Sequence, residues 1–367
     1  SKGKRMNITT KKSLLATMVG LFAATGAVQQ AYGQDAKNAA AQRALDEIIV
    51  TAEKRSASIQ DVPISISAFS GDRLEISGID SSSDLEMVTP GLSFSSDGRL
   101  GKVFIRGIGS PFLFGPGSDP SSSTYLDGVY LSRDYSSLID MLDLERVEVL
   151  KGPQGTIYGR NATGGAIKYV TKDPENEFGA KLSVKAGDYG MLSTRTEVDI
   201  PLIEDELLIH GAFVRTTRDG YTQNLLNPAE KIDFDDLFAG HVTLKYLASD
   251  DLEITFHGGF VEDDGDFAAR KHFNIDPSGL AAGATQIDDP RQIMADQGPR
   301  SASLKSWFVD ANAKWDLTWA EFSSITALQD VSAEPWREDL DATEIGALHQ
   351  GELGDINGFS EETKTFS

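Results

Sequence analysis

The sequence has no cysteine and only five histidines in 367 residues. Without cysteine, the chain has no disulfide framework, no thiolate metal site and no thiol nucleophile. The histidines are His210, His241, His257, His272 and His349, and they form neither an HExxH motif nor a pair close in sequence. We therefore expect no enzyme, no metal site and no cofactor.

Basic residues are also scarce, since 34 Lys and Arg stand against 56 Asp and Glu, for a net charge of −22. Nucleic acids bind basic surfaces because their phosphates are anionic, so we exclude nucleic acid as a partner. The acidic pairs Asp263-Asp264 and Asp288-Asp289 could bind calcium. They lie in loop-like segments, however, and we prefer to interpret them as solvated loops.

Long apolar runs are absent after residue 33. Residues 1–33 carry Lys11 and Lys12 before an apolar, small-residue run over residues 14–28, with small residues before a cleavage point after Gly33. This pattern is typical of a bacterial secretory signal peptide. The run is shorter than the ~20 apolar residues that a membrane-spanning helix needs. Any crossing of a membrane by the remaining chain must therefore use β-strands.

Glycine is plentiful, with 35 residues, and five of them lie between residues 143 and 173. Two strand-like runs, residues 144–151 and 166–171, flank a glycine-rich turn region there. Between them lie Gly152, Gly155, Gly159, Gly164 and Gly165. This density of glycine indicates positive φ angles or close approach of another backbone. The stretch predicts a tight β-structured module packed against a partner surface, and a phosphate-binding loop is the weaker alternative because no Gly-Lys-Ser/Thr follows.

Beyond residue 174, segments of about ten residues alternate apolar and polar side chains. The clearest segment is 307–318, where Trp307 and Trp315 lie on one face and Asp310 and Lys314 on the other. The same alternation occurs over residues 181–186, 191–200, 236–247 and 251–261. An apolar face bracketed by tryptophan is typical of a transmembrane barrel strand. A soluble β-sandwich also alternates, but the secretory signal and the tryptophan spacing favour the barrel.

Two connections complete this interpretation. Residues 267–303 are long and irregular, and we expect them to form an outer loop. Residues 187–190 are short, and we expect them to form a turn at the opposite, periplasmic end of the strands.

Four motifs in order resemble those of the TonB-dependent outer-membrane receptors. The first resembles the TonB box and consists of Asp46, Glu47, Ile48, Ile49, Val50, Thr51 and Ala52. The others are Phe104–Gly107, Tyr125–Val129 and the segment from Val149 to Gly165. Taken alone, residues 46–52 could be the first strand of the domain that follows. The resemblance instead favours an exposed strand that adds to the sheet edge of a partner.

The resemblance implies a fold in several parts. We expect a signal peptide at 1–33, a flexible leader with the TonB box at 34–55, an α+β plug domain at 56–175, and antiparallel transmembrane β-barrel strands at 176–367. Barrels of the family have about 22 strands and hold the plug inside. Only seven or eight strands fit here, so the chain resembles an N-terminal fragment with an incomplete barrel.

The resemblance also implies a function. We expect active uptake of a scarce nutrient, in particular a ferric siderophore, across the outer membrane of a Gram-negative bacterium. The implied partners are the TonB energy-transducing protein, outer-membrane lipid and a small-molecule substrate, with iron present only in the transported chelate. The alternatives are another bulky substrate, such as an oligosaccharide, an aromatic compound or cobalamin, and a truncated remnant that does not transport. A signalling role is not expected, because the box follows the signal peptide closely.

Five residues are candidates for contacts between plug and barrel. We expect Arg106 and Arg160 to pair with carboxylates of the barrel lumen, although a wet boundary at which they matter little is the alternative. Gly107, Gly164 and Gly165 would allow close approach at the same boundary.

A glycine-, proline- and serine-rich segment, residues 109–123, carries Phe112 and Phe114 near its centre. We expect these two side chains to contact substrate, and the alternative is that they pack the loop down.

Overall fold

The computed structural model describes the chain from residue 49 onward, with gaps. The described residues are 49–51, 57–97, 100–110, 119–131, 143–229, 231–266, 285, 287–294, 301–333, 338–339, 349–350 and 359–366. The expected signal peptide, Phe112 and Phe114 lie outside these ranges, as does most of the expected leader.

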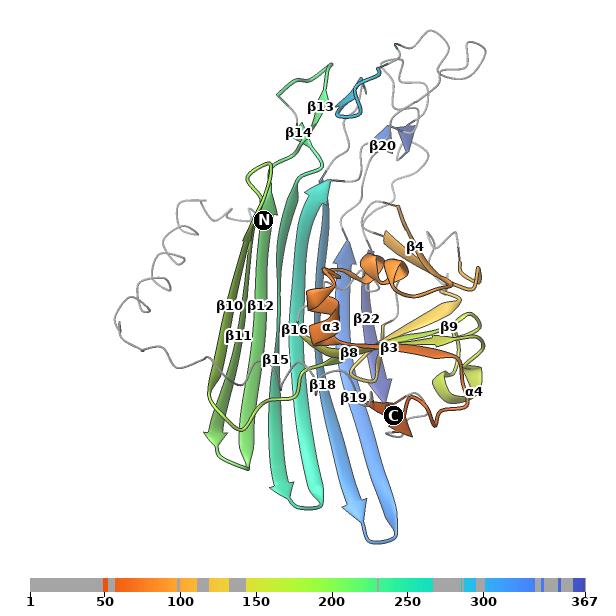
Figure 1. The fold of residues 1–367 in the computed structure, drawn as a ribbon, viewed down its shortest axis with the longest axis vertical. Helices are drawn as coiled ribbons and strands as arrows, with labels where there is room; N and C mark the ends of the chain where they lie inside the picture. The colour runs from red at the N-terminus through yellow and green to blue at the C-terminus, as the bar shows by residue number, and fades with distance from the viewer. Residues whose placement is uncertain are drawn as a thin grey trace, which may run out of the picture. The chain divides into compact units, whose positions relative to one another are not determined.

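The domain that we expected to be a plug is built on a five-stranded sheet (Figure 1). Its elements are β3 (Ile66–Ser70), α3 (Gly71–Ile76), η2 (Ser82–Met87), β4 (Leu92–Asp97), β5 (Leu100–Ile105), β6 (Ser122–Leu126), β7 (Val129–Leu131), β8 (Leu144–Lys151), α4 (Gly155–Tyr158) and β9 (Gly165–Thr171). The sheet order is β3-β8-β9-β6-β7, with β6 parallel to β9 and the other pairs antiparallel. Strands β4 and β5 form a separate hairpin. We call this domain the plug.

Both faces of the plug sheet are covered, because side chains alternate along its central strands. Val147 and Val149 of β8 belong to a core cluster with α3 and η2. Leu150 of β8 and Ala166 of β9 belong to a second cluster on the other face, which also holds Val50. The near-alternation of residues 144–151 therefore predicts the strand correctly, and its few interruptions arise because apolar side chains are needed on both sides.

One plug segment, the motif Tyr125–Val129, contains a tight turn. The chain turns between Leu126 and Val129, which pair with each other. The turn residues Asp127 and Gly128 have φ angles of 48° and 87°. Two consecutive positive φ angles are what a tight two-residue hairpin requires, and Asp-Gly is a favoured sequence for it.

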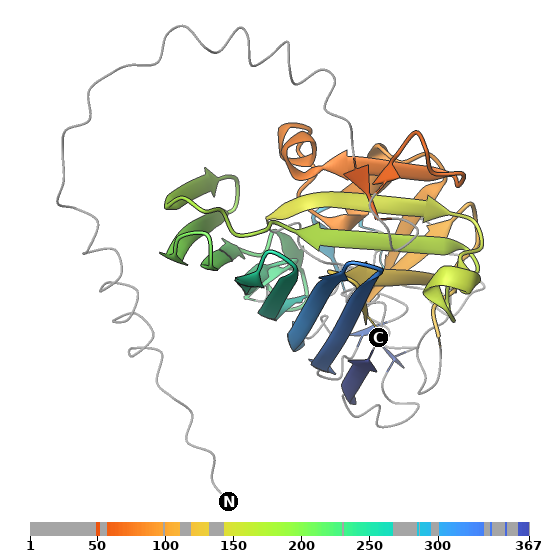
Figure 2. The same ribbon diagram turned by 90° about the horizontal axis from the view of Figure 1, so that it is seen from below.

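The second part is an eight-stranded antiparallel sheet, which we call the wall (Figure 1). Its strands, in spatial as well as sequence order, are β10 (Gly179–Ala186), β11 (Leu192–Ile203), β12 (Leu207–Arg218), β15 (Asp235–Ser249), β16 (Leu252–Asp266), β18 (Ser301–Leu317), β19 (Ala320–Ala333) and β22 (Phe359–Phe366). Seen from below, the strands form a curved row (Figure 2). No helix among the described residues is long and apolar enough to cross a membrane.

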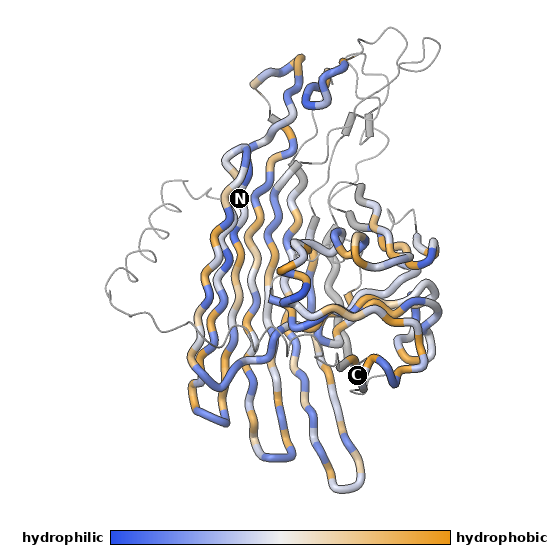
Figure 3. The backbone as a smooth tube through the Cα atoms, viewed as in Figure 1, coloured by the Kyte–Doolittle hydropathy of each residue, from blue (hydrophilic) through white to orange (hydrophobic). Residues whose placement is uncertain are grey.

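The wall has one apolar face and one polar face, as the alternation predicts. Trp307 and Trp315 of β18 are 42% and 47% exposed, whereas Asp310 on the opposite face is 5% exposed. The hydropathy changes from residue to residue along wall strands such as β12 and β15 (Figure 3). Strands β12 and β19 were not identified from the sequence. In β12 the reason is that Leu208, Ala212 and other small or apolar side chains also occupy the inner face.

The register of the wall corrects the expected position of the turn at residues 187–190. Leu192 pairs with Thr217, and Arg218 pairs with Asp235. The turn therefore lies at the same end of the wall strands as Asp266 and Ser301, which flank the expected outer loop. Successive connections of an antiparallel sheet alternate between the two ends of its strands, so the turn and the expected outer loop cannot lie at opposite ends.

Short strands extend from this end of the wall. They are β13 (Thr222–Asn224), β14 (Lys231–Ile232) and β17 (Gln292–Ile293), which form a three-stranded sheet, and β20 (Glu338–Asp339) with β21 (His349–Gln350). Ile232 and Ile293 are buried against each other there. Near the other end of the described chain, β1 (Ile49–Val50) pairs with β2 (Ala57–Ser58).

Candidate functional site

The end of the expected TonB box is attached to the plug. Asp46, Glu47, Ile48 and Ala52 lie outside the described residues, but Ile49, Val50 and Thr51 lie within them. Val50 is fully buried and packs in the cluster that contains Leu150. The box is therefore anchored here by apolar packing at one residue and by polar contacts at the next.

Thr51 is held by four side chains of the plug, Arg146, Glu148, Tyr158 and Lys168, which we call the Thr51 clamp. The backbone N–H of Thr51 donates to Glu148 Oε1 at 3.0 Å, and its hydroxyl donates to the same oxygen at 3.2 Å. Lys168 Nζ donates to the carbonyl oxygen of Thr51 at 2.7 Å, and the Tyr158 hydroxyl donates to that oxygen at 3.4 Å. Both backbone polar groups of Thr51 are thus satisfied by side chains from β8, β9 and α4.

The clamp is built around a buried ion pair. Glu148 is fully buried, and Lys168 Nζ lies 3.4 Å from its Oε2 atom. Arg146 donates from Nε to Glu148 Oε1 at 2.9 Å. Burial alone would raise the pKa of Glu148, but the charge of Lys168, the Thr51 N–H and Arg146 together hold that pKa below its usual value. Glu148 is therefore the charged centre of the clamp.

Chemically, this arrangement is a docking site for a short extended segment. It offers one acceptor and several donors to the main chain at Thr51, and it forms no covalent bond. A strand bound in this way cannot use the same backbone groups to pair with another protein. Release of Thr51 from the clamp is therefore a condition for strand pairing at this position.

Sequence reasoning did not identify the clamp. Residues 144–151 and 166–171 were identified only as strand-like runs, yet both faces of β8 and β9 are buried, and Glu148 and Lys168 are buried with them. One signal was available: opposite charges occupy the middle of two neighbouring, otherwise apolar strands. The contact with Thr51, 97 residues away from Glu148, had no local signal.

Ion pairs join the plug to the wall. Wall residues Lys181 and Lys185 of β10 contact Glu75 at 2.9 Å and Asp80 at 2.8 Å. Lys245 of β15 contacts Asp173 at 2.8 Å. In these three pairs the wall provides the cation and the preceding domain the carboxylate, which is the reverse of the expected polarity.

The two arginines expected to make such pairs are placed elsewhere. Arg106 donates to the hydroxyl of Ser65 at 2.7 Å. Arg160 is 75% exposed, and its guanidinium lies 3.8 Å from Asp119. Among the described residues, both arginines therefore contact plug residues, and neither contacts a carboxylate of the wall.

The three glycines expected at the same boundary serve the plug itself. A Cβ atom on Gly165 would lie 2.1 Å from the carbonyl oxygen of Leu150, and one on Gly164 would lie 2.7 Å from the Ser122 hydroxyl. Gly107 has a φ of 77° but nothing within 4 Å of a Cβ position. Close approach is therefore needed between plug strands at Gly164 and Gly165, and turn geometry requires Gly107.

A deeper contact between plug and wall involves Asp143, just before β8. Its carboxylate contacts His210 Nε2 of β12, and the other ring nitrogen of His210 lies 2.7 Å from Asp199 of β11. Lys172 Nζ lies 2.7 Å from Asp143 and 3.0 Å from Glu197. Burial opposes the charge on Asp143, but the contacts with His210 and Lys172 hold its pKa below the usual value.

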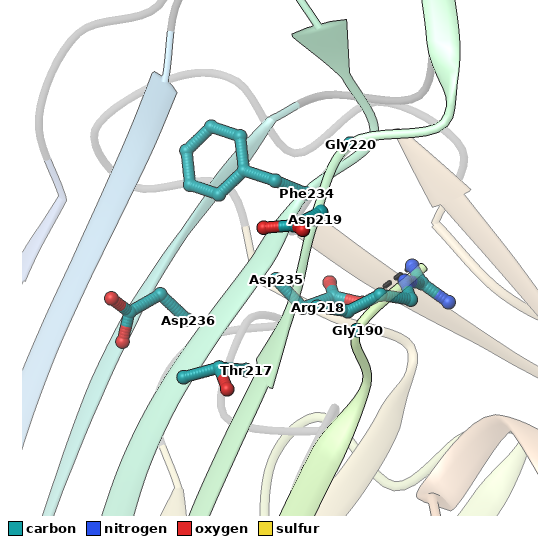
Figure 4. A pocket seen from close by; sticks show the side chains of 8 residues that line it. All are labelled: Gly190, Thr217, Arg218, Asp219, Gly220, Phe234, Asp235 and Asp236. Atoms are coloured by element: carbon teal, nitrogen blue, oxygen red, sulfur yellow. Dashed lines mark ion pairs between the residues drawn. The ribbon is translucent and has the colours of Figure 1, made fainter. Parts of the chain in front are cut away.

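A groove of 440 Å³ lies at the end of the wall from which β13 and β14 extend (Figure 4). It is lined by Gly190, Thr217, Arg218, Asp219, Gly220, Phe234, Asp235 and Asp236. Arg218 forms an ion pair with Asp235 and lies over the ring of Tyr221 at 5.2 Å. Arg215 pairs with Asp236. The groove is thus polar with an excess of carboxylates, and it favours ligand groups that donate hydrogen bonds.

Comparison with known proteins agrees with this architecture. Residues 58–166 match the family model described as the TonB-dependent receptor plug domain. The chain is 31% identical over 194 residues to the pesticin receptor of Yersinia pestis, covering 51% of this chain and 27% of that protein. It is 29% identical over 192 residues to the ferrichrome outer membrane transporter/phage receptor of Escherichia coli K12, covering 51% and 24%.

Among solved structures, the ferric yersiniabactin uptake receptor FyuA from Yersinia pestis superimposes with a TM-score of 0.65 at 21% identity. The match covers 77% of this chain and 43% of that structure, so the fold includes the wall as well as the plug. The chain spans about a quarter of the length of the curated relatives, 27% and 24%. Residues 58–166 form a TonB-dependent receptor plug domain, and the strands that follow have the fold of the solved receptor.

Proposed function

We propose that the protein containing this chain takes up a ferric siderophore across the outer membrane, using energy delivered by a TonB protein. The observation that carries the proposal is the plug domain at residues 58–166, continuous with a wall to which it is ion-paired. A plug held by hydrogen bonds and ion pairs, with no disulfide cross-link because the chain has no cysteine, can be displaced and restored.

The relatives support iron as the cargo. One is named for ferrichrome, and the solved neighbour is described as a ferric yersiniabactin uptake receptor. These names concern those proteins, and the transfer to this chain rests on the shared plug domain. In this proposal the iron belongs to the transported chelate and is cargo.

The wall supports a location in the outer membrane. Its exposed face carries Phe238, Phe256, Trp307 and Trp315. Aromatic and aliphatic side chains on the outer face, with charged groups on the other, suit strands in contact with lipid. Residues 1–33 would provide the secretory signal needed to reach that membrane.

The partner would bind through residues 46–52. An added strand gains affinity from main-chain hydrogen bonds, so the proposal depends on backbone donors in this segment. Ile49→Pro removes one such donor and fixes φ, whereas Ile49→Val preserves both donor and strand propensity.

The test uses the full receptor in a strain that lacks its own copy, grown under iron limitation. Uptake of radioactive iron is measured with a panel of ferric siderophores, and substrate binding to whole cells is measured separately. We expect energy-dependent uptake with the wild type and with Ile49→Val, and binding without uptake with Ile49→Pro. Unimpaired uptake by Ile49→Pro would contradict the role of the box. Uptake of cobalamin or an oligosaccharide, with no ferric chelate transported, would contradict the proposal that the substrate is a ferric siderophore.

A further inference from the structure

Three potential metal ligands meet where the plug touches the wall. Asp143 comes from the plug, His210 from β12 and His241 from β15, and all three side chains are buried. One ligand atom from each residue lies within 4.8 Å of the other two. The histidines are 31 positions apart, but the register of β12 and β15 pairs Ala212 with His241, two residues from His210 on the same face.

His241 is the residue whose position ordinary hydrogen bonding does not explain. Its Nε2 atom is buried and has no hydrogen-bond partner among the described residues. The nearest carboxylate oxygen, Asp143 Oδ2, lies 3.7 Å away, beyond hydrogen-bond range. In a tetrahedral zinc site two ligand atoms lie about 3.3 Å apart, given metal–ligand bonds of about 2.0–2.2 Å. The separation of these two atoms thus suits a shared cation better than a shared proton.

The surrounding groups are those that support a metal site. His210 contacts Asp143 through Nε2, and its Nδ1 lies 2.7 Å from Asp199 Oδ1. A carboxylate on the distal nitrogen is the usual partner of a metal-bound histidine, because it fixes the tautomer and the ring orientation. Lys172 Nζ lies 2.7 Å from Asp143 Oδ1 and so leaves Oδ2 to face the histidines.

The charge balance points the same way. The connected carboxylates are Asp143, Asp199, Glu197 and Glu75, and the connected lysines are Lys172 and Lys181. With both histidines neutral, this group carries two excess negative charges. One divalent cation would neutralise them, and so would two protons on the histidines. A proton on His241 Nε2 would have no acceptor at hydrogen-bond distance, whereas a cation between the three residues could contact all of them.

We propose that Asp143, His210 and His241 bind one divalent transition metal ion of the zinc type, which links the plug to two strands of the wall. Two imidazole nitrogens and one carboxylate are a usual zinc donor set, with a fourth position left for water. The site differs from the sequence-based expectation of no metal, because strand pairing assembles ligands that are distant in sequence. It is independent of the siderophore proposed above.

The experiment measures zinc binding to the full receptor, purified without a histidine tag and stripped with a chelator. We expect one zinc ion per receptor by elemental analysis and calorimetry. With cobalt as the probe, we expect the visible absorption of a site with low coordination number and nitrogen ligands. Zinc should also raise the thermal unfolding midpoint.

Three variants separate the proposed site from general binding. His241→Ala should abolish saturable zinc binding while it leaves the contacts of His210 with Asp143 and Asp199 in place. Asp199→Asn should weaken binding about 10–100-fold through the orientation of His210. The matched control is His257→Ala, since His257 is a partly buried wall histidine paired with Asp310 at 2.8 Å, and its loss should not affect the site.

The proposal is overturned if the stripped wild type binds no stoichiometric zinc, or if His241→Ala binds it as tightly as the wild type. In either case the three residues would form a protonated ion-pair cluster only. Folding is checked by the unfolding midpoint in the absence of metal, where wild type and His241→Ala should agree.

Discussion

Glu148 and Lys168 are directly opposite each other on β8 and β9, and their charged groups meet at 3.4 Å beneath Thr51. Each of them also bonds to Thr51. One residue pair therefore joins the central strands of the plug sheet to the end of the segment proposed to bind TonB. Displacement of that segment must separate Thr51 from both charges.

The first prediction concerns the charge of Glu148. Glu148→Gln keeps an acceptor for the Thr51 N–H but leaves Lys168 without its buried counter-charge. Breaking a buried pair by removal of one partner costs about 3–5 kcal/mol. We expect denaturant unfolding of the full receptor in detergent to show a loss in this range. Glu145→Gln is the control, because Glu145 is 50% exposed and should change stability little.

The same pair can be separated from its surroundings by a double-mutant cycle. Lys168→Gln alone should lower the free energy of unfolding as much as Glu148→Gln does. The double variant should lose less than the sum of the two single losses. If the two losses of unfolding free energy add strictly, the two charges do not interact. The charge of Glu148 would then be stabilised only by its contacts with Thr51 and Arg146.

The second prediction is a dependence on pH. The pKa of Glu148 is lowered from its usual value of 4.5, so its contribution is complete above that value and is lost as the pH falls through the lower value of the folded protein. Acid should therefore release Thr51 below about pH 4.5. The chain has no cysteine, so a Glu53→Cys variant accepts a single spin label whose mobility reports release.

This label should become mobile on acidification in the wild-type background. In the Glu148→Gln background it should be mobile already near neutral pH, and it should show no further step in acid. A step of equal size in both backgrounds would assign the titration to another group.

The third prediction concerns the hydroxyl of Thr51. Thr51→Val preserves size and β-branching but removes the bonds to Glu148 and Lys168. Hydrogen bonds to charged groups contribute about 1.5–3 kcal/mol, and Glu148 and Lys168 keep their other partners in this variant. We expect a more mobile label at position 53 with Thr51→Val, and near wild-type mobility with Thr51→Ser. Equal mobility in all three proteins would show that backbone bonds alone hold the segment.

Local patterns predicted most strands but few of the contacts between them. The alternation of Trp307, Asp310 and Trp315 set the faces of β18, because each face of that strand meets one kind of environment. The inner face of β12 meets apolar neighbours at Ala212 and Val214, so its alternation is weaker and the strand was missed.

The functional contacts were harder to predict for a different reason. Thr51 meets Glu148 across 97 positions, and Asp143 meets His210 across 67. Such contacts depend on strand register, on which face each strand turns inward and on how the plug meets the wall. Composition and periodicity say little about strand register or about how the plug meets the wall. Arg106 and Arg160 were therefore expected at the boundary between plug and barrel, whereas Lys181 and Lys185 were not.

The last prediction concerns Gly128 at the tip of the β6–β7 hairpin. Its φ of 87° strains any residue with a side chain, and a Cβ atom there would lie 2.8 Å from Ile325 Cδ1 of the wall. We expect Gly128→Ala to cost about 1–2 kcal/mol through the backbone, plus a steric cost at Ile325, measured as loss of unfolding free energy.

Gly107→Ala is the matched control, since Gly107 has a φ of 77° but no atom within 4 Å of its Cβ position. It should show the backbone cost without the steric cost. Ile325→Val shortens the wall side chain, so in combination with Gly128→Ala it should recover the steric part and leave the backbone part. If Ile325→Val gives no recovery, the tip of the hairpin does not press against the wall, and the loss in Gly128→Ala is a property of the turn alone.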